Sequence, residues 1–323
     1  MKKLLTSMLC LSMLLTGCQK ENQNSNLKHV GVLQITAHNS LDEAYEGFKA
    51  GMESEGFIEG STVMYDFQNA LGDKSNMTTI AQKFVAEENN LILAIGTEAC
   101  QTVAQETSEI PIIGTAITDY VEAGLVDSNE KPGGNISGLS DATPLDQQLD
   151  LLLQFAPQAK KIGIIYCSSE PNSVIQVNTM EQEILKRQLT PIIKTVADQT
   201  AITDTLEALC NDVDALYIPS DNTLASAMGA VQTITVDHQV PTIVAVEKMC
   251  ADGGLASIGI SYYQLGYETG VMAAKVLKGE AKVSETPIQT ATDSTIYYNQ
   301  KILNKLGLTL PESIKEVAKE VNQ

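Results

Sequence analysis

Short apolar runs of strand length alternate along this chain with longer segments that carry apolar residues at helical spacing. The first run is 30–36 (VGVLQIT), and the helical spacing follows it in 41–55. Further apolar runs occur at 63–67, 91–95 and 110–114, with helical stretches between them. This alternation predicts a parallel sheet that is covered by helices on both faces.

The same pattern starts again after Pro157. The predicted strands of this second unit are 161–166, 191–196, 215–218 and 242–246, and its predicted helices are 174–188, 202–210 and 224–236. A length of 323 residues is enough for two such units of roughly 150 residues each. The sequence therefore predicts two α/β lobes.

The C-terminal third adds elements after both units are already complete. The predicted elements are a helix at 262–278 ended by Gly279, a strand at 288–298, and short helices at 302–306 and 313–321. They fit best as returns of the chain to each lobe, as in type I bilobal binding proteins. The predicted fold is thus α/β and type I periplasmic-binding-protein-like, with two Rossmann-like lobes whose parallel sheets are joined by a multi-crossing hinge. Ligands of open parallel sheets bind beyond the carboxyl ends of the strands, which places a ligand between the two lobes.

This prediction divides the chain into four parts. They are a signal peptide at 1–17, a lipid-linked tether at 18–28, a first lobe of 29–143 plus about 262–282, and a second lobe of 144–261 plus about 283–323.

The N-terminus has the pattern of an export signal. Lys2 and Lys3 precede an apolar stretch, 4–15, whose helical length of about 18 Å is too short for a bilayer core of about 30 Å. The stretch ends in Leu-Thr-Gly-Cys at 15–18, which resembles a bacterial lipobox. The resemblance implies cleavage before Cys18 and a lipid (diacylglyceryl, with acyl chains such as palmitate) on its sulfur, which holds the protein on the extracytoplasmic face of the cell membrane. An ordinary signal peptide with a chance cysteine is the alternative.

Charge and residue chemistry exclude several classes of function. The chain has 21 Lys+Arg against 40 Asp+Glu, which argues against binding of nucleic acid and against a basic membrane-surface protein. The three histidines have no His-x-x-x-His spacing, and no nucleophile elbow, dinucleotide fingerprint or phosphate loop occurs. The sequence therefore predicts a protein that is not an enzyme and has no cofactor or metal. Four cysteines beyond Cys18 sit in or beside apolar segments, which favours buried free thiols over disulfides: Cys100, Cys167, Cys210 and Cys250.

Polar residues follow several predicted strands of both units. Hydroxyl groups and helix-start N–H groups there can receive a carboxylate, and Asp or Glu side chains can receive an ammonium. A single residue of this kind is more often a helix cap than a ligand contact. Their convergence on one sheet edge favours a binding site for a free amino acid.

Six motifs resemble the ABC transporter substrate-binding lipoprotein family of the tryptophan/tyrosine type. They are HNSLDEAYEGFKAGMESEGF, ITDYVEAGLV, GLSDATPLDQQLDLL, KKIGIIYCSSEPNS, PSDNTLAS and GISYYQLGYETG, in the order of the family. The resemblance implies ligand contacts at Ser40, Thr97, Asp119, Asp141, Ser169, Glu170, Asn172, Ser173, Asp221, Asn222 and Glu247. The sequence departs from the family pattern at Tyr120, where Pro is usual, and at Cys167-Ser168, where Asn-Pro is usual.

The resulting hypothesis is a monomeric binding component of an importer, which closes on an aromatic amino acid and delivers it to an ABC permease and its ATPase. The ammonium would bind to one or more of the acidic residues Asp119, Asp141, Glu170, Asp221 and Glu247. Replacement of Asp221 by Ala is then expected to weaken binding while leaving the ligand-free protein as stable as before. The alternatives are a branched-chain amino acid or another small solute as ligand, or a lipid-anchored receptor or adhesin that is not coupled to transport.

Overall fold

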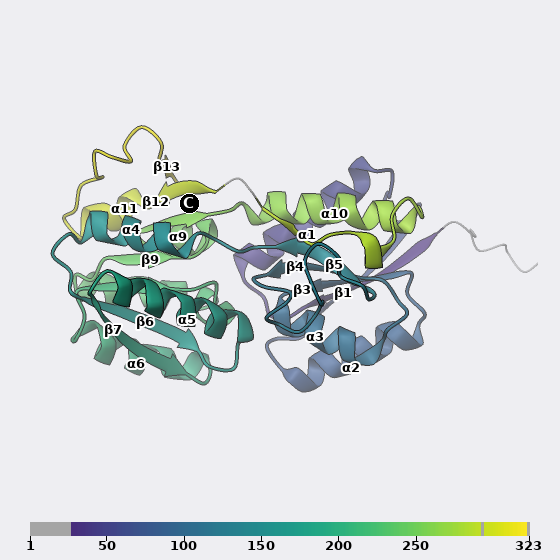
Figure 1. The fold of residues 1–323 in the computed structure, drawn as a ribbon, viewed down its shortest axis with the longest axis horizontal. Coiled ribbons are helices and arrows are strands. Elements are labelled where there is room, and N and C mark those ends of the chain that lie inside the picture. The colour runs from purple at the N-terminus through teal and green to yellow at the C-terminus, as the bar shows by residue number, and fades with distance from the viewer. Residues whose placement is uncertain (1–26, 292–293, 322–323) are drawn as a thin grey trace, which may run out of the picture.

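The computed structural model describes residues 27–291 and 294–321. The predicted signal peptide, Cys18 and nearly all of the tether lie outside the described residues. The chain forms two α/β lobes that lie side by side (Figure 1). In the described part of the chain, every helix is too short or too polar to cross a bilayer.

The first lobe has a six-stranded sheet in the order β11-β5-β4-β3-β1-β2, and its strand pairs are all parallel. Its strands are β1 (Lys28–Gln34), β2 (Val63–Asn69), β3 (Leu91–Ile95), β4 (Ile112–Ile117), β5 (Ile136–Ser140) and β11 (Gln289–Thr290). Its helices are α1 (Asn39–Ser54), α2 (Lys74–Ala86), α3 (Thr97–Glu106) and α10 (Tyr262–Leu277), with a 3₁₀ turn η2 (Val283–Glu285). Every residue of β3 is buried, which explains why this central strand is an unbroken apolar run.

The second lobe has a seven-stranded sheet in the order β13-β12-β10-β9-β8-β6-β7, in which only β10 and β12 pair antiparallel. Its strands are β6 (Lys161–Cys167), β7 (Thr190–Val196), β8 (Ala215–Ile218), β9 (Thr242–Val244), β10 (Ala256–Gly259), β12 (Thr295–Tyr298) and β13 (Lys319–Glu320). Its helices are α4 (Leu145–Phe155), α5 (Pro171–Lys186), α6 (Ile202–Cys210), α7 (Asn222–Ala225), α8 (Met228–Asp237), α9 (Glu247–Asp252) and α11 (Gln300–Lys305), with a 3₁₀ turn η1 (Gln199–Ala201).

The chain passes between the lobes three times: after β5, after β10, and between β11 and β12. The predicted strand 288–298 is therefore two short strands in different sheets. The segment 283–290, which the sequence analysis assigned to the second lobe, lies with the first. The Ile288 N–H donates to the Asn129 carbonyl at 2.8 Å, and the Ser137 hydroxyl donates to the Thr286 carbonyl at 2.8 Å.

Two of the predicted helices differ in the structure. The predicted helix 224–236 is broken into α7 and α8. The predicted helix 313–321 is wrong, because this segment forms turns and then β13, which pairs with β12. The apolar residues of this segment have helical spacing. However, its residues Lys319–Glu320 pair with the otherwise unpaired backbone edge of β12 and so join the sheet.

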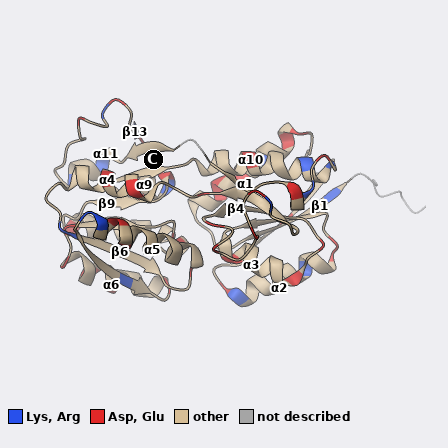
Figure 2. Cartoon of the chain, in the orientation of Figure 1, with Lys and Arg blue, Asp and Glu red and all other residues tan. Residues whose placement is uncertain are grey.

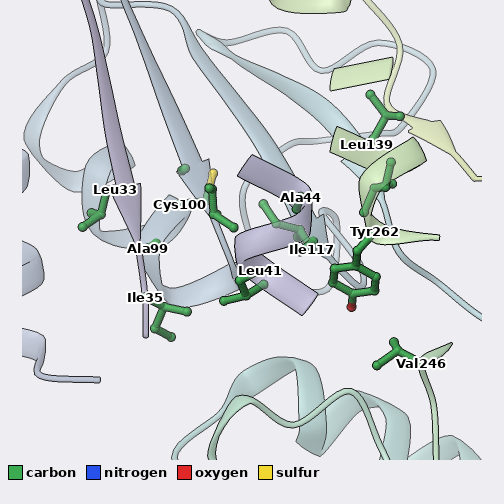
Figure 3. Packing of buried hydrophobic residues seen from close by; sticks show 14 of the residues in the cluster. Leu33, Ile35, Leu41, Ala44, Ala99, Cys100, Ile117, Leu139, Val246 and Tyr262 are labelled. Carbon is green, nitrogen blue, oxygen red and sulfur yellow. The ribbon is translucent and has the colours of Figure 1, made fainter. Parts of the chain in front are cut away.

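Apolar side chains from α1, α3 and the strands form the core of the first lobe (Figure 3). Leu33, Leu41, Ala44, Cys100 and Ile117 are all buried there. The four cysteines of the described residues are buried and unpaired, as the apolar context predicted.

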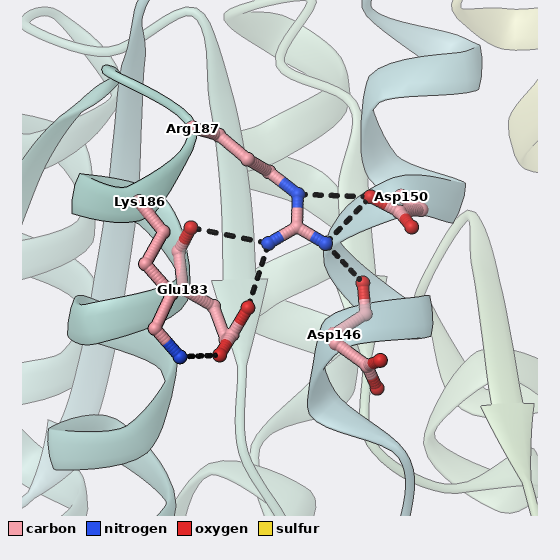
Figure 4. Close-up of polar contacts among 5 residues, drawn as sticks. All are labelled: Asp146, Asp150, Glu183, Lys186 and Arg187. Atoms are coloured by element: carbon pink, nitrogen blue, oxygen red, sulfur yellow. Dashed lines mark hydrogen bonds and ion pairs between the residues drawn. The ribbon is translucent and has the colours of Figure 1, made fainter.

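The chain contains one arginine, Arg187. It caps the C-terminal end of α5 and links this helix to α4 (Figure 4). Its guanidinium donates to Asp150 Oδ1 at 2.9 Å and to Glu183 Oε2 at 2.7 Å. Charged side chains of both signs occur on both lobes (Figure 2). Because this arginine is engaged between two helices, it is not available to the space between the lobes.

Candidate functional site

A cavity of about 240 Å³ lies between the two lobes at the carboxyl ends of their strands. Five lining residues come from the first lobe: Ile35, Thr36, Leu71, Gly72 and Glu98. Nine come from the second lobe: Cys167, Ser169, Glu170, Ala197, Asp198, Gln199, Asn222, Thr223 and Ser226. Drug-sized ligands occupy pockets of about 300 Å³ or more, so this cavity suits a smaller molecule.

The lining carries three carboxylates, Glu98, Glu170 and Asp198, and no Lys or Arg. Glu98 is at the start of α3, directly after β3, where Gly96 with a φ of +102° makes the tight turn. Its carboxylate makes no hydrogen bond within the described part of the chain. Burial raises the pKa of Glu98 and the charge of Glu170 raises it further, while the charge of Lys74, outside the cavity lining, acts in the opposite direction. The cavity is thus electronegative and favours a ligand that carries a positive charge.

Glu170 precedes Pro171, the first residue of α5, and is buried. Its Oε2 accepts the backbone N–H and the side-chain amide of Asn222, at 2.8 and 2.7 Å. Its Oε1 accepts the N–H and the hydroxyl of Thr223, at 2.8 and 2.7 Å. These four bonds hold the loop after β8 against the start of α5 and shape the second lobe's side of the cavity.

Asp221 lies behind the cavity wall and is fully buried. Its Oδ2 accepts the Cys167 N–H and the Ser173 hydroxyl, both at 2.7 Å, and its Oδ1 accepts the Leu224 N–H at 2.8 Å. Burial and the charge of Glu170 raise the pKa of Asp221 to about 7. Loss of this side chain is therefore expected to destabilise the ligand-free protein, contrary to the expectation from the sequence.

Some of the remaining predicted contacts line the cavity, and others lie behind or beside the residues that do. Ser169 and Asn222 line it together with Glu170. Asn172, like Ser173, lies behind the wall, where its amide donates to the Ser220 carbonyl at 2.7 Å. Thr97 is buried beside Glu98, and its hydroxyl oxygen has no partner among the described residues.

Eight of the eleven predicted contacts do not line the cavity, and four of these have not yet been described: Ser40, Asp119, Asp141 and Glu247. Ser40 is buried in α1, whose N-cap residue is His38. Asp119 Oδ1 accepts the N–H groups of Val121 and Glu122, both at 3.0 Å, and so caps a turn.

The other two are acidic. Asp141 lies at the first crossing, where it accepts the hydroxyl of Tyr262, and burial raises its pKa. Glu247 begins α9, and partial burial raises its pKa. Of the five acidic residues predicted to hold an ammonium, only Glu170 reaches the cavity.

The cavity residues that follow the two edge strands were not predicted from the sequence. Leu71 and Gly72 come after β2, and 197–199 comes after β7. Thr36 and Glu98 are likewise among the first residues after a strand. The same rule that selected Thr97 and Ser169, applied to every strand, would have included them.

Several direct contacts join the lobes around the cavity. Gln176 Nε2 donates to Thr118 Oγ1 at 3.1 Å and also contacts Ser220 Oγ. The start of α1 contacts the second lobe through three pairs: His38 with Asn222 at 3.1 Å, Asn39 with Asp252 at 2.9 Å, and Glu43 with Lys248 at 3.5 Å. The two lobes are therefore closed on each other.

Comparisons with known proteins agree with this architecture. The model of the ABC transporter substrate binding protein family matches residues 29–322. A tyrosine-binding protein of Clostridioides difficile is 38% identical over 306 residues, which cover 91% of this chain and 88% of that protein.

Two solved structures differ in how well they superpose. A Streptococcus pneumoniae ABC domain in complex with L-Trp is 38% identical and superposes with a TM-score of 0.88, covering 91% of this chain and 99% of that one. The ligand-free, open structure of a Clostridium difficile substrate-binding protein with adhesive properties is 39% identical, covers 92% and 99%, and gives a TM-score of only 0.71. Identity and coverage are nearly the same for both, so this chain superposes better on the ligand complex than on the open structure for a reason other than sequence divergence. These structures confirm the predicted type I bilobal fold.

Proposed function

Because the chain belongs to the ABC transporter substrate-binding protein family, we propose that it is the binding component of an importer for an aromatic amino acid. The observation that carries this proposal is the interlobe cavity of about 240 Å³ with the unpaired carboxylate of Glu98 in its wall. The tyrosine-binding relative and the L-Trp complex support an aromatic ligand.

The ligand's ammonium is assigned to Glu98, with the charge of Glu170 nearby. An ammonium at this position relieves the repulsion between the two carboxylates and the cost of burying Glu98 without a partner. The ligand's carboxylate is assigned to uncharged hydrogen-bond donors, because the single arginine is engaged elsewhere and no lysine lines the cavity. The hydroxyl groups of Thr36 and Ser169, on opposite walls, are the proposed donors, and Ser169 Oγ also lies 3.1 Å from Cys167 Sγ.

The proposed transport role depends on closure of the two lobes over the ligand. Since the lining comes from both lobes, an open form offers a ligand the contacts of one lobe at a time, and the ligand shifts the population toward the closed form. The permease and its ATPase are the proposed partners, and the permease would recognise the closed form of the monomeric protein. A lipid on Cys18 would keep the protein beside the permease on the extracytoplasmic face of the membrane.

The test is a thermal-shift screen of refolded, ligand-free protein that begins near Asn22, against the twenty amino acids. At a hundredfold excess over Kd, a ligand adds about 2.7 kcal/mol of stability. For a protein of this size the melting temperature then rises by about 4 °C. A rise with aromatic amino acids supports the proposal, whereas a rise only with Leu, Ile or Val makes the ligand aliphatic. No rise with any amino acid overturns it.

A second candidate function is adhesion or ligand sensing without transport. It is favoured by one observation, the adhesive properties named for the relative that is 39% identical. Neighbouring genes for a permease and an ATPase would favour transport. Binding of the intact protein to host cells, unaffected by saturating amino acid, would favour adhesion.

A further inference from the structure

A buried hydrogen bond joins the two lobes outside the cavity. Gln176 Nε2 donates to Thr118 Oγ1 at 3.1 Å. Thr118 follows β4 of the first lobe, whereas Gln176 lies in α5 of the second lobe. Gln176 is 3% exposed and Thr118 is 9% exposed, and neither lines the cavity. The bond therefore forms where the lobes meet, and its two side chains are not part of the cavity wall.

The second lobe fixes the direction of the Gln176 amide. Its Oε1 accepts the Ser220 N–H at 3.1 Å and the Tyr217 hydroxyl at 3.4 Å, and its Nε2 also contacts Ser220 Oγ. Both donors to the oxygen belong to the second lobe, and Tyr217 is fully buried in β8. Because the amide oxygen is held in this way, the nitrogen is the end that remains for the first lobe. The second lobe thus orients the donor for Thr118 with its own atoms.

Thr118 also connects this bond to the hinge. Its hydroxyl interacts with the carboxyl group of Asp141, which begins the first crossing and accepts the hydroxyl of Tyr262, just after the second crossing. Burial raises the pKa of Asp141, and the hydroxyl groups of Tyr262 and Thr118 act against this rise. In the sheet of the first lobe, β4 lies between β5, from which the chain crosses, and β3, which leads to the cavity residue Glu98. The interlobe bond is therefore placed between the hinge and the cavity.

Burial separates this bond from the more exposed contacts between the lobes. Asn39 and Asp252 meet at an exposed position, and the side chains of Glu43 and Lys248 are 45% and 28% exposed. Exposed pairs of this kind contribute little, because water competes for both partners. A buried hydrogen bond between uncharged groups changes an equilibrium constant by about three- to tenfold. We expect the buried bond to shift the balance between the open and closed forms by this factor.

We propose that the hydrogen bond between Gln176 and Thr118 is a latch that sets the ratio of closed to open protein, and hence the affinity for every ligand of the cavity. The inference rests on the proposed function, because it needs a ligand that binds the closed form better than the open form. Apparent affinity is proportional to the fraction of protein in the binding-competent form. Loss of the latch therefore weakens binding without changing any contact of the ligand, and both residues are positioning residues.

Isothermal titration calorimetry with L-tyrosine, L-tryptophan and L-phenylalanine tests the latch in two variants of Thr118. Thr118→Val keeps the shape of the side chain but has no hydroxyl group, whereas Thr118→Ser keeps the hydroxyl group. We expect Thr118→Val to bind about three- to tenfold more weakly, by the same factor for every ligand that binds, and Thr118→Ser to stay within about twofold of the wild type. A loss confined to one ligand would make Thr118 a specificity residue and overturns the latch, as would equal losses in both variants.

The matched control is Thr235→Val. Thr235 is 2% exposed, and its hydroxyl donates to the Val231 carbonyl at 2.9 Å within α8, so it makes no contact between the lobes. This variant loses a buried threonine hydroxyl in the same way and should bind all three amino acids as the wild type does.

A double-mutant cycle separates the latch from the contact of Thr118 with Asp141. Gln176→Met removes the amide and keeps a side chain of similar length. We expect Thr118→Val combined with Gln176→Met to bind about as weakly as the weaker single variant, because the second substitution finds the bond already broken. Additive losses overturn the inference. If Gln176→Met does not fold, the comparison of the two Thr118 variants still decides.

Failure of the latch is distinguishable from failure of the proposed function. If the wild type binds an aromatic amino acid and Thr118→Val binds it equally well, the latch is wrong and the proposed function stands. If the wild type binds none of the three amino acids, the proposed function is wrong, and the latch, which rests on it, falls with it.

Discussion

His38, in the loop after β1 of the first lobe, shares a hydrogen bond of 3.1 Å with Asn222 of the second lobe. Asn222 donates its own amide to Glu170, so its Oδ1 is the acceptor and His38 Nε2 is the donor. His38 Nδ1 is buried and has no partner within the described residues. The closed form therefore holds a neutral imidazole.

Closure is expected to weaken in acid. Burial lowers the pKa of His38 below 6.5, although Asn222, Glu170, Asp42 and Asp252 act in the opposite direction. In the open form the pKa returns toward 6.5, so the stabilisation of the closed form is complete above about 6.5 and is lost as the pH falls below it. Ligand affinity should be lower at pH 5.5 than at pH 7.5, as measured by calorimetry.

Replacement of His38 by Gln separates this effect from the titration of carboxylates in the cavity. Glutamine keeps a side-chain N–H for Asn222 but takes up no proton. His38→Gln should therefore bind with a smaller loss of affinity between the two pH values. An unchanged slope would mean that His38 does not couple closure to pH.

Glu98→Gln should separate binding from stability. The substitution removes the partner of the ammonium, so amino-acid affinity should fall at least about tenfold. Because burial and Glu170 raise the pKa of Glu98, its ionised form destabilises the folded protein at neutral pH. The ligand-free variant should thus melt at the same temperature or slightly higher. Glu109→Gln, at an exposed glutamate outside the cavity, is the control and should change neither quantity.

Asp221→Ala should instead destabilise the protein. The substitution leaves the buried N–H groups of Cys167 and Leu224 without their acceptor, and each such loss costs about 1–3 kcal/mol. Calorimetry of the ligand-free variant should show a melting temperature lower by roughly 3–8 °C. Asp212→Ala, at an exposed position, should not shift it. An unchanged melting temperature for Asp221→Ala would restore its interpretation as a ligand contact that the fold does not need.

Much of the fold is predictable because its central strands are buried on both faces. Such strands are unbroken apolar runs, and the predicted ranges 91–95 and 215–218 coincide with β3 and β8. The helix at 262–278 is likewise almost identical to α10. Short elements at the sheet edges, such as β11 and β13, depend on which neighbour they meet. The local sequence periodicity therefore does not predict where these short strands lie.

The site was less predictable for a related reason. Polar residues after a strand can line the cavity, as Ser169 does, or accept hydrogen bonds from buried backbone groups, as Asp221 does, and both roles need the same residue types. Only the packing of the two lobes separates these roles. The order of strands in each sheet, which makes β2 and β7 edge strands followed by residues that line the cavity, likewise emerges only from the assembled structure.

Membrane attachment is tested by Cys18→Ser. If Cys18 carries the lipid, this variant should leave the membrane fraction, because the described residues contain no helix able to span a bilayer. Cys10→Ser, within the apolar stretch of the predicted signal peptide, is the matched control and should remain attached. Retention of Cys18→Ser in the membrane after an alkaline wash would argue against lipidation at this residue.

Gly266 of α10 lies directly against the backbone of α1. A Cβ atom at this position would be 1.9 Å from the Ala44 carbonyl oxygen, and at Gly47 of α1 it would be 2.0 Å from the Tyr263 carbonyl oxygen. Gly266→Ala should therefore force the helices apart, at a cost of about 1–3 kcal/mol. The melting temperature should fall by roughly 2–5 °C.

The control is Gly229→Ala in α8, where a Cβ atom meets nothing within 4 Å. Alanine there removes only the conformational freedom of glycine, so this variant should be more stable by about 0.5–1 kcal/mol. The same substitution in two helices thus has opposite expected signs, and chemical denaturation measures both. If Gly266→Ala is as stable as the wild type, α10 can move relative to α1. The close contact would then not be what ties the returning chain to the first lobe.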